Sequence, residues 1–182
     1  MFTLMVLQPP TLPQDLLDQL ANANAKIRKT ALKQMASLPA SSQRNQLLIQ
    51  TLSTDENASN CAFAAQILGQ LQAKEAIDTL LLVLTKHTNK NVRLKIVTAL
   101  GQLGDRKVVD VLLQALVKDR GIEVRREAIR VLVGWRELRA LPALQKAYEK
   151  TKDRASSYHS LCQDVLLALS ELGGVEPLLP II

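Results

Sequence analysis

The sequence predicts an all-α fold, a right-handed α-solenoid of about five stacked helical hairpins. Three observations support this prediction. The chain repeats itself about every 32 residues, so that Val92 and Ile96 recur as Val124 and Ala128, and a period of roughly 20–50 residues is typical of stacked supersecondary units. Apolar residues within each repeat recur at helical spacing. Only 3% of the 182 residues are aromatic while 47% are hydrophobic, which favours helices packed on helices over a β-sandwich.

The fourth repeat shows both helices of a hairpin most clearly. The first helix is expected over 106–118, where apolar residues lie on nearly all sides, so it must be covered on more than one face. Asp119-Arg-Gly121 then ends the apolar run. The second helix is expected over 122–136, with one buried stripe at i, i+4, i+7 and i+11. That stripe consists of Val124, Ala128, Val131 and Trp135.

The same stripe recurs in the other four repeats. Its members are Ile27, Ala31, Gln34 and Leu38 in the first; Asn60, Ala64, Ile67 and Leu71 in the second; Val92, Ile96, Ala99 and Leu103 in the third; and Leu161, Val165, Ala168 and Leu172 in the fifth. The polar Gln34 and Asn60 occupy core positions of the first two repeats, as is typical of terminal repeats. The fifth stripe is displaced by 37 residues, so about five extra residues are expected within 151–159.

One domain is expected to contain all the repeats. An apolar N-terminal arm, 1–11, precedes a single repeat domain over 12–182. The expected units are 12–39, 43–72, 74–104, 106–136 and 139–173, followed by a partial C-terminal cap over 174–182.

Composition narrows the class of protein without identifying a partner. The net charge of +6 permits binding to nucleic acid, an acidic protein or an anionic membrane surface. No window has the length and apolar character of a membrane span, and the N-terminus lacks the basic region and cleavage site of a signal peptide. The two cysteines have no metal-like spacing, so a reduced, cytoplasmic protein is expected.

A short motif in the third repeat resembles a known family. Asn91-Val-Arg93, followed by Leu100-Gly-Gln-Leu-Gly-Asp105, resembles the HEAT-like repeat, in particular the short form of phycobilisome lyase subunits and their relatives. The resemblance covers roughly 12–179 and implies a HEAT-like solenoid. The ankyrin and tetratricopeptide signatures, which have similar periods, are absent.

The resemblance also implies a structural role for three arginines. HEAT repeats commonly pair an Asp in the turn within the repeat with an Arg six residues later, a spacing that Asp119 and Arg125 match. Arg28 and Arg93 occupy the same position, opposite Asn22 and His87, while Cys61 and Cys162 replace the arginine in the second and fifth repeats. A guanidinium there can bind orphan carbonyls and carboxylates at the turn and tie neighbouring layers together.

No residue pattern predicts a catalytic, metal or cofactor site. His87 lies in a turn, where a hydrogen-bonding role is expected, and the adjacent Ser160 and His159 are weak evidence for nucleophilic catalysis. No His-Glu dipeptide is present, which disfavours the iron binding known in some HEAT-like proteins, and two distant histidines cannot form a metal site. Trp135 is expected in the core, although an exposed ring that stacks on a base or pigment is the alternative.

The second helices of such a stack usually line its concave face, and their outward positions predict a binding surface. This surface is basic at its N-terminal end, neutral in the middle and mixed to acidic at its C-terminal end, where Glu123, Glu127, Asp164 and Glu171 interrupt it. The residues expected to bind a partner are Lys26, Lys29, Lys33, Phe63, Gln66, Leu94, Lys95, Arg126 and Arg130. An apolar centre rimmed by charge suits a protein partner.

The sequence therefore favours a non-enzymatic scaffold or adaptor that binds a protein partner, such as an acidic one, without any cofactor. The resemblance implies one alternative, a factor that attaches or removes bilins or assists assembly of a phycobiliprotein; if the chain is an enzyme, it is a bilin lyase-like subunit. The other alternative is nucleic-acid binding, but this would favour a continuous basic groove with aromatic platforms, which the acidic residues interrupt.

Overall fold

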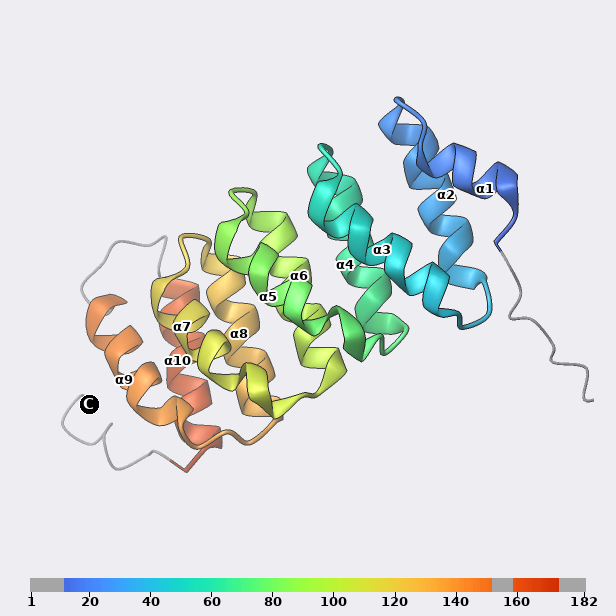
Figure 1. Cartoon of the computed structure of the whole chain (residues 1–182). Helices are drawn as coiled ribbons and strands as arrows, with labels where there is room; N and C mark the ends of the chain where they lie inside the picture. Colours follow the sequence, from blue (N-terminus) through green and yellow to red (C-terminus); the bar gives the residue numbers. More distant parts are fainter. Residues whose placement is uncertain (1–11, 152–158, 174–182) are drawn as a thin grey trace, which may run out of the picture.

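The computed structural model confirms a right-handed α-solenoid of five helical hairpins (Figure 1). It describes residues 12–151 and 159–173. The expected arm, most of the expected insertion and the expected cap lie outside these residues. The helices are α1 (Gln14–Leu20), α2 (Ala25–Ser37), α3 (Ser42–Thr54), α4 (Ala58–Gln70), α5 (Ile77–Lys86), α6 (Lys90–Leu103), α7 (Val109–Lys118), α8 (Ile122–Gly134), α9 (Ala140–Thr151) and α10 (His159–Glu171), with short 3-10 helices η1 (Lys74–Ala76) and η2 (Arg106–Val108) before α5 and α7.

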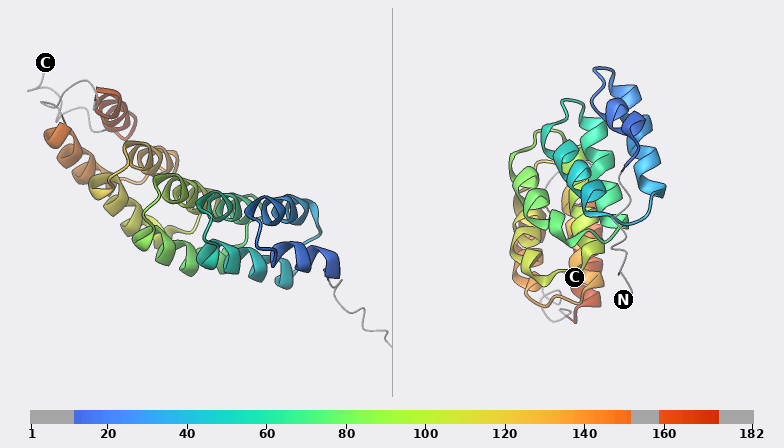
Figure 2. Two further views of the ribbon diagram at one scale, coloured as in Figure 1. Left: turned by 90° about the horizontal axis from the view of Figure 1, so that it is seen from above. Right: turned by 45° about the vertical axis from the view of Figure 1, so that its right-hand side comes forward.

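The hairpins stack side by side into two curved layers. The left view of Figure 2 shows the first helices, α1, α3, α5, α7 and α9, along the outer side of the curve. The second helices, α2, α4, α6, α8 and α10, lie along the inner side and pack against one another in sequence order (Figure 2). The second helices therefore form the concave face, as the sequence predicted.

Side-chain caps define where the second helices begin. Asn24, Asn57 and Asn89 precede α2, α4 and α6, and the side chain of each accepts a hydrogen bond from the first turn of its helix. Such N-caps satisfy backbone donors that have no partner inside the helix. At the other end of α6, Gly104 adopts a φ of 68°, the left-handed conformation that glycine tolerates best at a helix C-terminus.

The repeated stripes form the interior of the stack. In the third and fifth hairpins all four stripe residues are buried, and so are Val124, Ala128 and Val131 of α8. The first hairpin differs because no hairpin precedes it among the described residues: Ile27 is 38% exposed and Gln34 is exposed. Asn60 is buried as expected. The stack therefore has a continuous apolar interior with a more polar N-terminal end.

Trp135 differs in part from the expected core position. It lies at the C-cap of α8 and is half-buried against the core. Its exposed side is covered by Arg106, whose guanidinium carbon lies 5.2 Å from the ring centroid and whose Nη2 donates to the Trp135 carbonyl at 2.9 Å. The ring is thus held in place by a cation–π contact within the protein.

Candidate interaction surface

One hydrogen bond shapes the turn within each of the first four hairpins. The side-chain oxygens of Asn22, Asp55 and Asp119 accept from the backbone N–H two residues later, at 2.9, 2.8 and 2.7 Å. His87 Nδ1 accepts in the same way from Asn89 N–H at 3.0 Å. Four different turns therefore share one local geometry, which sets the direction of the second helix. This confirms the hydrogen-bonding role expected for His87.

Arg28 and Arg93 join consecutive hairpins across these turns. Arg93 donates from Nε and Nη2 to the Asp119 carboxylate at 2.8 and 2.9 Å, and from Nη1 to the carbonyls of His87 and Thr88. Arg28 binds Asp55 in the same two-point manner at 2.8 and 2.7 Å. Each arginine thus binds its own turn through carbonyls and the next hairpin through a carboxylate. The carboxylate of Asp119 binds the preceding hairpin's Arg93, while Arg125 Nε donates to the Leu116 carbonyl at 2.8 Å.

The second and third hairpins lack this arginine–aspartate pair. Cys61 occupies the arginine position, and its Sγ donates to the Asp55 carbonyl at 3.0 Å. That carbonyl lies six residues earlier, as do the Asn22 and His87 carbonyls bound by Arg28 and Arg93. Burial, followed by the charge of Asp55, raises the pKa of the Cys61 thiol. The protonated thiol therefore satisfies the turn carbonyl but cannot bind the next hairpin. Cys61 and Cys162 are both free of disulfides.

The basic patch, which we define as Lys26, Lys29 and Lys33, lies at the N-terminal end of the concave face. Lys26 and Lys33 are exposed. Lys29 is half-buried: its Nζ donates to Ser59 Oγ at 2.8 Å and lies 5.9 Å from the centroid of the Phe63 ring. Lys26 and Lys33 therefore present the two most accessible ammonium groups of the patch.

The middle of the concave face is less open than the sequence suggested. Phe63 and Leu94 are half-buried and pack against the core, while Gln66 and Lys95 are also half-buried. Part of each predicted anchor is therefore already used in packing between neighbouring hairpins, and only the remaining surface can contact a partner.

Arg126 and Arg130 are both paired with carboxylates. Arg126 Nε donates to Asp164, which joins α8 to α10. Arg130 Nε donates to Glu127 at 2.8 Å, and Thr98 donates to the same carboxylate at 2.8 Å. Burial opposes ionisation of Glu127, but the hydrogen bonds from Arg130 and Thr98 lower its pKa overall. Both arginines thus organise the C-terminal end of the face.

Glycines set how closely the second helices approach each other. A Cβ added at Gly69 would lie 2.8 Å from Ala99 Cα, and one added at Gly101 would lie 2.5 Å from Val131 Cγ2. The repeat places Val133 at the corresponding position of α8, opposite Ala168 of α10. A valine cannot allow the same approach, because its own side chain fills that space. The junction of α8 and α10 therefore has a valine where α4 and α6 have glycine.

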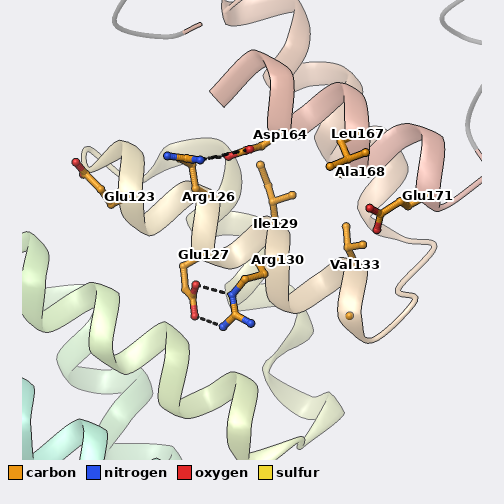
Figure 3. A pocket seen from close by; sticks show the side chains of 11 residues that line it. Glu123, Arg126, Glu127, Ile129, Arg130, Val133, Asp164, Leu167, Ala168 and Glu171 are labelled. Atoms are coloured by element: carbon orange, nitrogen blue, oxygen red, sulfur yellow. Dashed lines mark hydrogen bonds and ion pairs between the residues drawn. The ribbon is translucent and has the colours of Figure 1, made fainter. Parts of the chain in front are cut away.

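A groove of about 600 Å³ opens between α8 and α10, and Val133 lines it. Ile129, Val133 and Ala168 line its apolar part together with Leu167, which is 60% exposed. Figure 3 shows Glu123 at one end of this α8–α10 groove and Glu171 at the other, with the Arg126–Asp164 and Glu127–Arg130 pairs on its two sides.

Comparison with known families now identifies the architecture. The sequence matches the HEAT repeats over residues 45–121 and again over 80–162, which together span more than half of the chain. The chain belongs to the HEAT repeat family. No curated protein matches this HEAT repeat protein in sequence.

A solved structure supports the same fold. A chain from a study of the structural basis of microtubule plus end tracking by XMAP215, CLIP-170 and EB1 is similar, with a TM-score of 0.59. The similarity covers 93% of this chain and 84% of that one at 17% sequence identity. At that identity the likeness shows the shared solenoid alone.

The described part of this HEAT solenoid contains no group of three or more His, Cys, Asp or Glu residues that could hold a metal ion. None of its described helices is long and apolar enough to cross a membrane. The concave face presents charged and apolar side chains to a binding partner.

Leu167, which lines the groove, is not among the residues that the sequence predicted to bind a partner. Two positions in the alignment of repeats carried a detectable signal. Val133 replaces a glycine, and Leu167 replaces the polar or charged residues Lys33, Gln66, Thr98 and Arg130. The groove itself is formed between side chains of two different hairpins, an arrangement that only the structure supplies.

Proposed function

We propose that this HEAT repeat protein is a non-enzymatic scaffold that binds a protein partner on its concave face. The observation that carries the proposal is the uneven surface of that face, where the basic patch and the α8–α10 groove lie at opposite ends of one row of helices. Separated chemical features on a curved, pre-formed surface suit recognition of a protein segment. Two free cysteines fit a reducing, cytoplasmic setting.

At the N-terminal end, the exposed Lys26 and Lys33 favour an acidic stretch of the partner. Their ammonium groups would attract it over a distance of about 8–10 Å at physiological salt. The exposed parts of Phe63 and Leu94 would then contact apolar side chains as the segment continues toward α6. In this arrangement the charged groups speed association and fix the position of the segment on the surface, and the apolar contacts supply most of the affinity.

The two alternatives gain little support from the site. A bilin carries carboxylates, but the two arginines of the α8–α10 groove are already paired with Asp164 and Glu127. Nucleic acid would meet Glu123 and Glu171 on the same face. A phycobilin titration followed by visible absorbance, and a duplex DNA titration at several salt concentrations, would each reveal binding that the scaffold proposal does not expect.

The proposal is tested with a short fluorescein-labelled Glu-rich peptide and the full chain. Replacing both Lys26 and Lys33 with Glu should weaken binding, measured by fluorescence anisotropy, about fivefold or more, because two favourable charge contacts become repulsive. The matched control is Lys74→Glu with Lys107→Glu, which makes the same change in net charge at exposed residues of η1 and η2. Equal weakening by both pairs would contradict a site on the concave face.

A further inference from the structure

The α8–α10 groove has an apolar floor and one exposed apolar side chain beside it. Ile129 is 4% exposed and Ala168 2%, so they belong to the protein's interior, whereas Leu167 is 60% exposed beside them. A leucine this exposed next to a groove of about 600 Å³ offers an anchor to another molecule. The groove also lies within the size range, roughly 300–1,000 Å³, of sites that accept side chains or small ligands.

The rim of this groove is acidic although the chain carries a net charge of +6. Four carboxylates and two guanidinium groups line it. Arg126 and Arg130 are paired with Asp164 and Glu127. Glu123 has only a 3.4 Å contact with Lys90, in which both side chains are more than half exposed. Glu171 is exposed, and no described residue forms an ion pair with it. Two carboxylates thus remain available to an incoming cation.

The two carboxylates lie at opposite ends of the groove, an arrangement that suits a basic, helical occupant. Glu171 occupies the same repeat position as Gly134, which is eleven residues after Glu123. Eleven residues of α-helix span about 16 Å and complete close to three turns. Two basic residues eleven apart therefore lie on one side of a helix, about 16 Å apart along its axis. Residues at i+4 and i+7 of that helix face the same side.

We propose that the α8–α10 groove binds an amphipathic helix of a protein partner, with basic side chains at i and i+11 and apolar side chains at i+4 and i+7. The basic residues pair with Glu123 and Glu171, and the apolar residues contact Leu167 and the floor around Val133. This is the helix-in-groove mode of recognition. The inference rests on the proposed function, because it adds a second chemical feature to the partner of the same concave face.

The test uses a fluorescein-labelled, alanine- and glutamine-based helical peptide with Lys at i and i+11 and Leu at i+4 and i+7. The full chain should bind it, and replacing both lysines with Glu should abolish binding. Leu167→Ala should weaken binding about tenfold, as expected for an interface anchor. Its matched control is Leu82→Ala on the outer helix α5, where the leucine is 51% exposed, and this variant should bind like the wild type.

A second pair of variants tests the charges. Glu171→Lys and Asp78→Lys alter the net charge equally, but Asp78 lies on α5. Only Glu171→Lys should weaken binding, by about fivefold, and added salt should narrow the difference. Equal effects of the two variants, or unchanged binding by Leu167→Ala, would overturn the proposal. So would preference for the Glu-containing peptide, or self-association through Leu167 seen by sedimentation. Binding of the Glu-rich peptide depends on Lys26 and Lys33, whereas binding of the helical peptide depends on the α8–α10 groove. Failure of one proposal can therefore be distinguished from failure of the other.

Discussion

Arg93 of the third hairpin binds Asp119 of the fourth through two nearly equal hydrogen bonds of 2.8 and 2.9 Å. Both side chains are less than a tenth exposed. The same guanidinium holds two carbonyls of its own turn. The pair therefore links successive hairpins at the edge of the solenoid, and its low exposure means that either charge alone would be costly.

Breaking this pair should destabilise the protein strongly. We expect Arg93→Ala to lower the free energy of unfolding by about 3–5 kcal/mol, because it leaves a buried carboxylate without its cation. Lys90→Ala is the control, since the Lys90 side chain is 59% exposed in its ion pair with Glu123 and such pairs contribute about 0–1 kcal/mol. Urea unfolding followed by circular dichroism measures both. Similar losses would show that burial of the pair is unimportant.

Acid should weaken the corresponding link between the first two hairpins. Burial opposes ionisation of Asp55, but hydrogen bonds from Arg28, the Asn57 N–H and Asn60 outweigh it and lower its pKa below the ordinary value of 3.8. Since the folded chain binds this proton less readily than the unfolded chain, the stabilisation is complete above the ordinary pKa. It is lost as the pH falls through the lowered value.

The Asp55→Asn variant isolates this contribution. It should be less stable than wild type at neutral pH, and the difference should shrink below about pH 4, when the wild-type carboxyl takes up its proton. Glu56→Gln, which changes an exposed neighbour, should show no such convergence. Unfolding midpoints measured in a pH series would contradict the assignment if the gap between Asp55→Asn and wild type stayed constant.

The close approach of α4 and α6 should not tolerate a methyl group. Gly69→Ala would place its Cβ 2.8 Å from Ala99 Cα, and we expect a loss of about 1–3 kcal/mol from overpacking. Gly134→Ala has nothing within 4 Å of the added carbon and should be neutral or stabilise α8 by up to about 1 kcal/mol. Thermal unfolding compares the two variants. A neutral Gly69→Ala would mean that α4 and α6 do not pack so closely.

The missing link between the second and third hairpins should be restorable. Cys61 and His87 are 26 residues apart, as are Arg93 and Asp119. Cys61→Arg alone should destabilise the protein by burying an unpaired charge. Adding His87→Asp should recover stability, with a coupling energy of about 0.5–3 kcal/mol in a double-mutant cycle. Additive effects of the two substitutions would indicate that this junction does not share the geometry of its neighbours.

Much of the fold could be predicted from sequence because the same helical spacing of apolar residues recurs in every repeat. Val92, Val124 and Leu161 are all buried, as their spacing predicted. Ile27 is exposed because burial of a stripe also requires an adjacent hairpin, and spacing within one helix cannot supply that information.

The candidate site was less predictable because it depends on contacts between repeats. The arginine spacing indicated a turn motif, but the direction of the Arg93–Asp119 pair follows from how two hairpins stack. Phe63 and Leu94 looked like exposed anchors, yet neighbouring helices cover part of each. The groove beside Leu167 similarly lies between two hairpins, so the spacing within one helix does not reveal it.

Chemical-shift mapping tests the central claim, that the concave face binds a protein segment, most directly. Amide spectra of the full chain would be recorded with the Glu-rich peptide and then with the Lys- and Leu-containing helix. We predict shifts confined to α2, α4 and α6 with the first peptide and to α8 and α10 with the second. Shifts concentrated on the outer helices α3, α5 and α7, or saturating concentrations of both peptides with no shift, would contradict the claim.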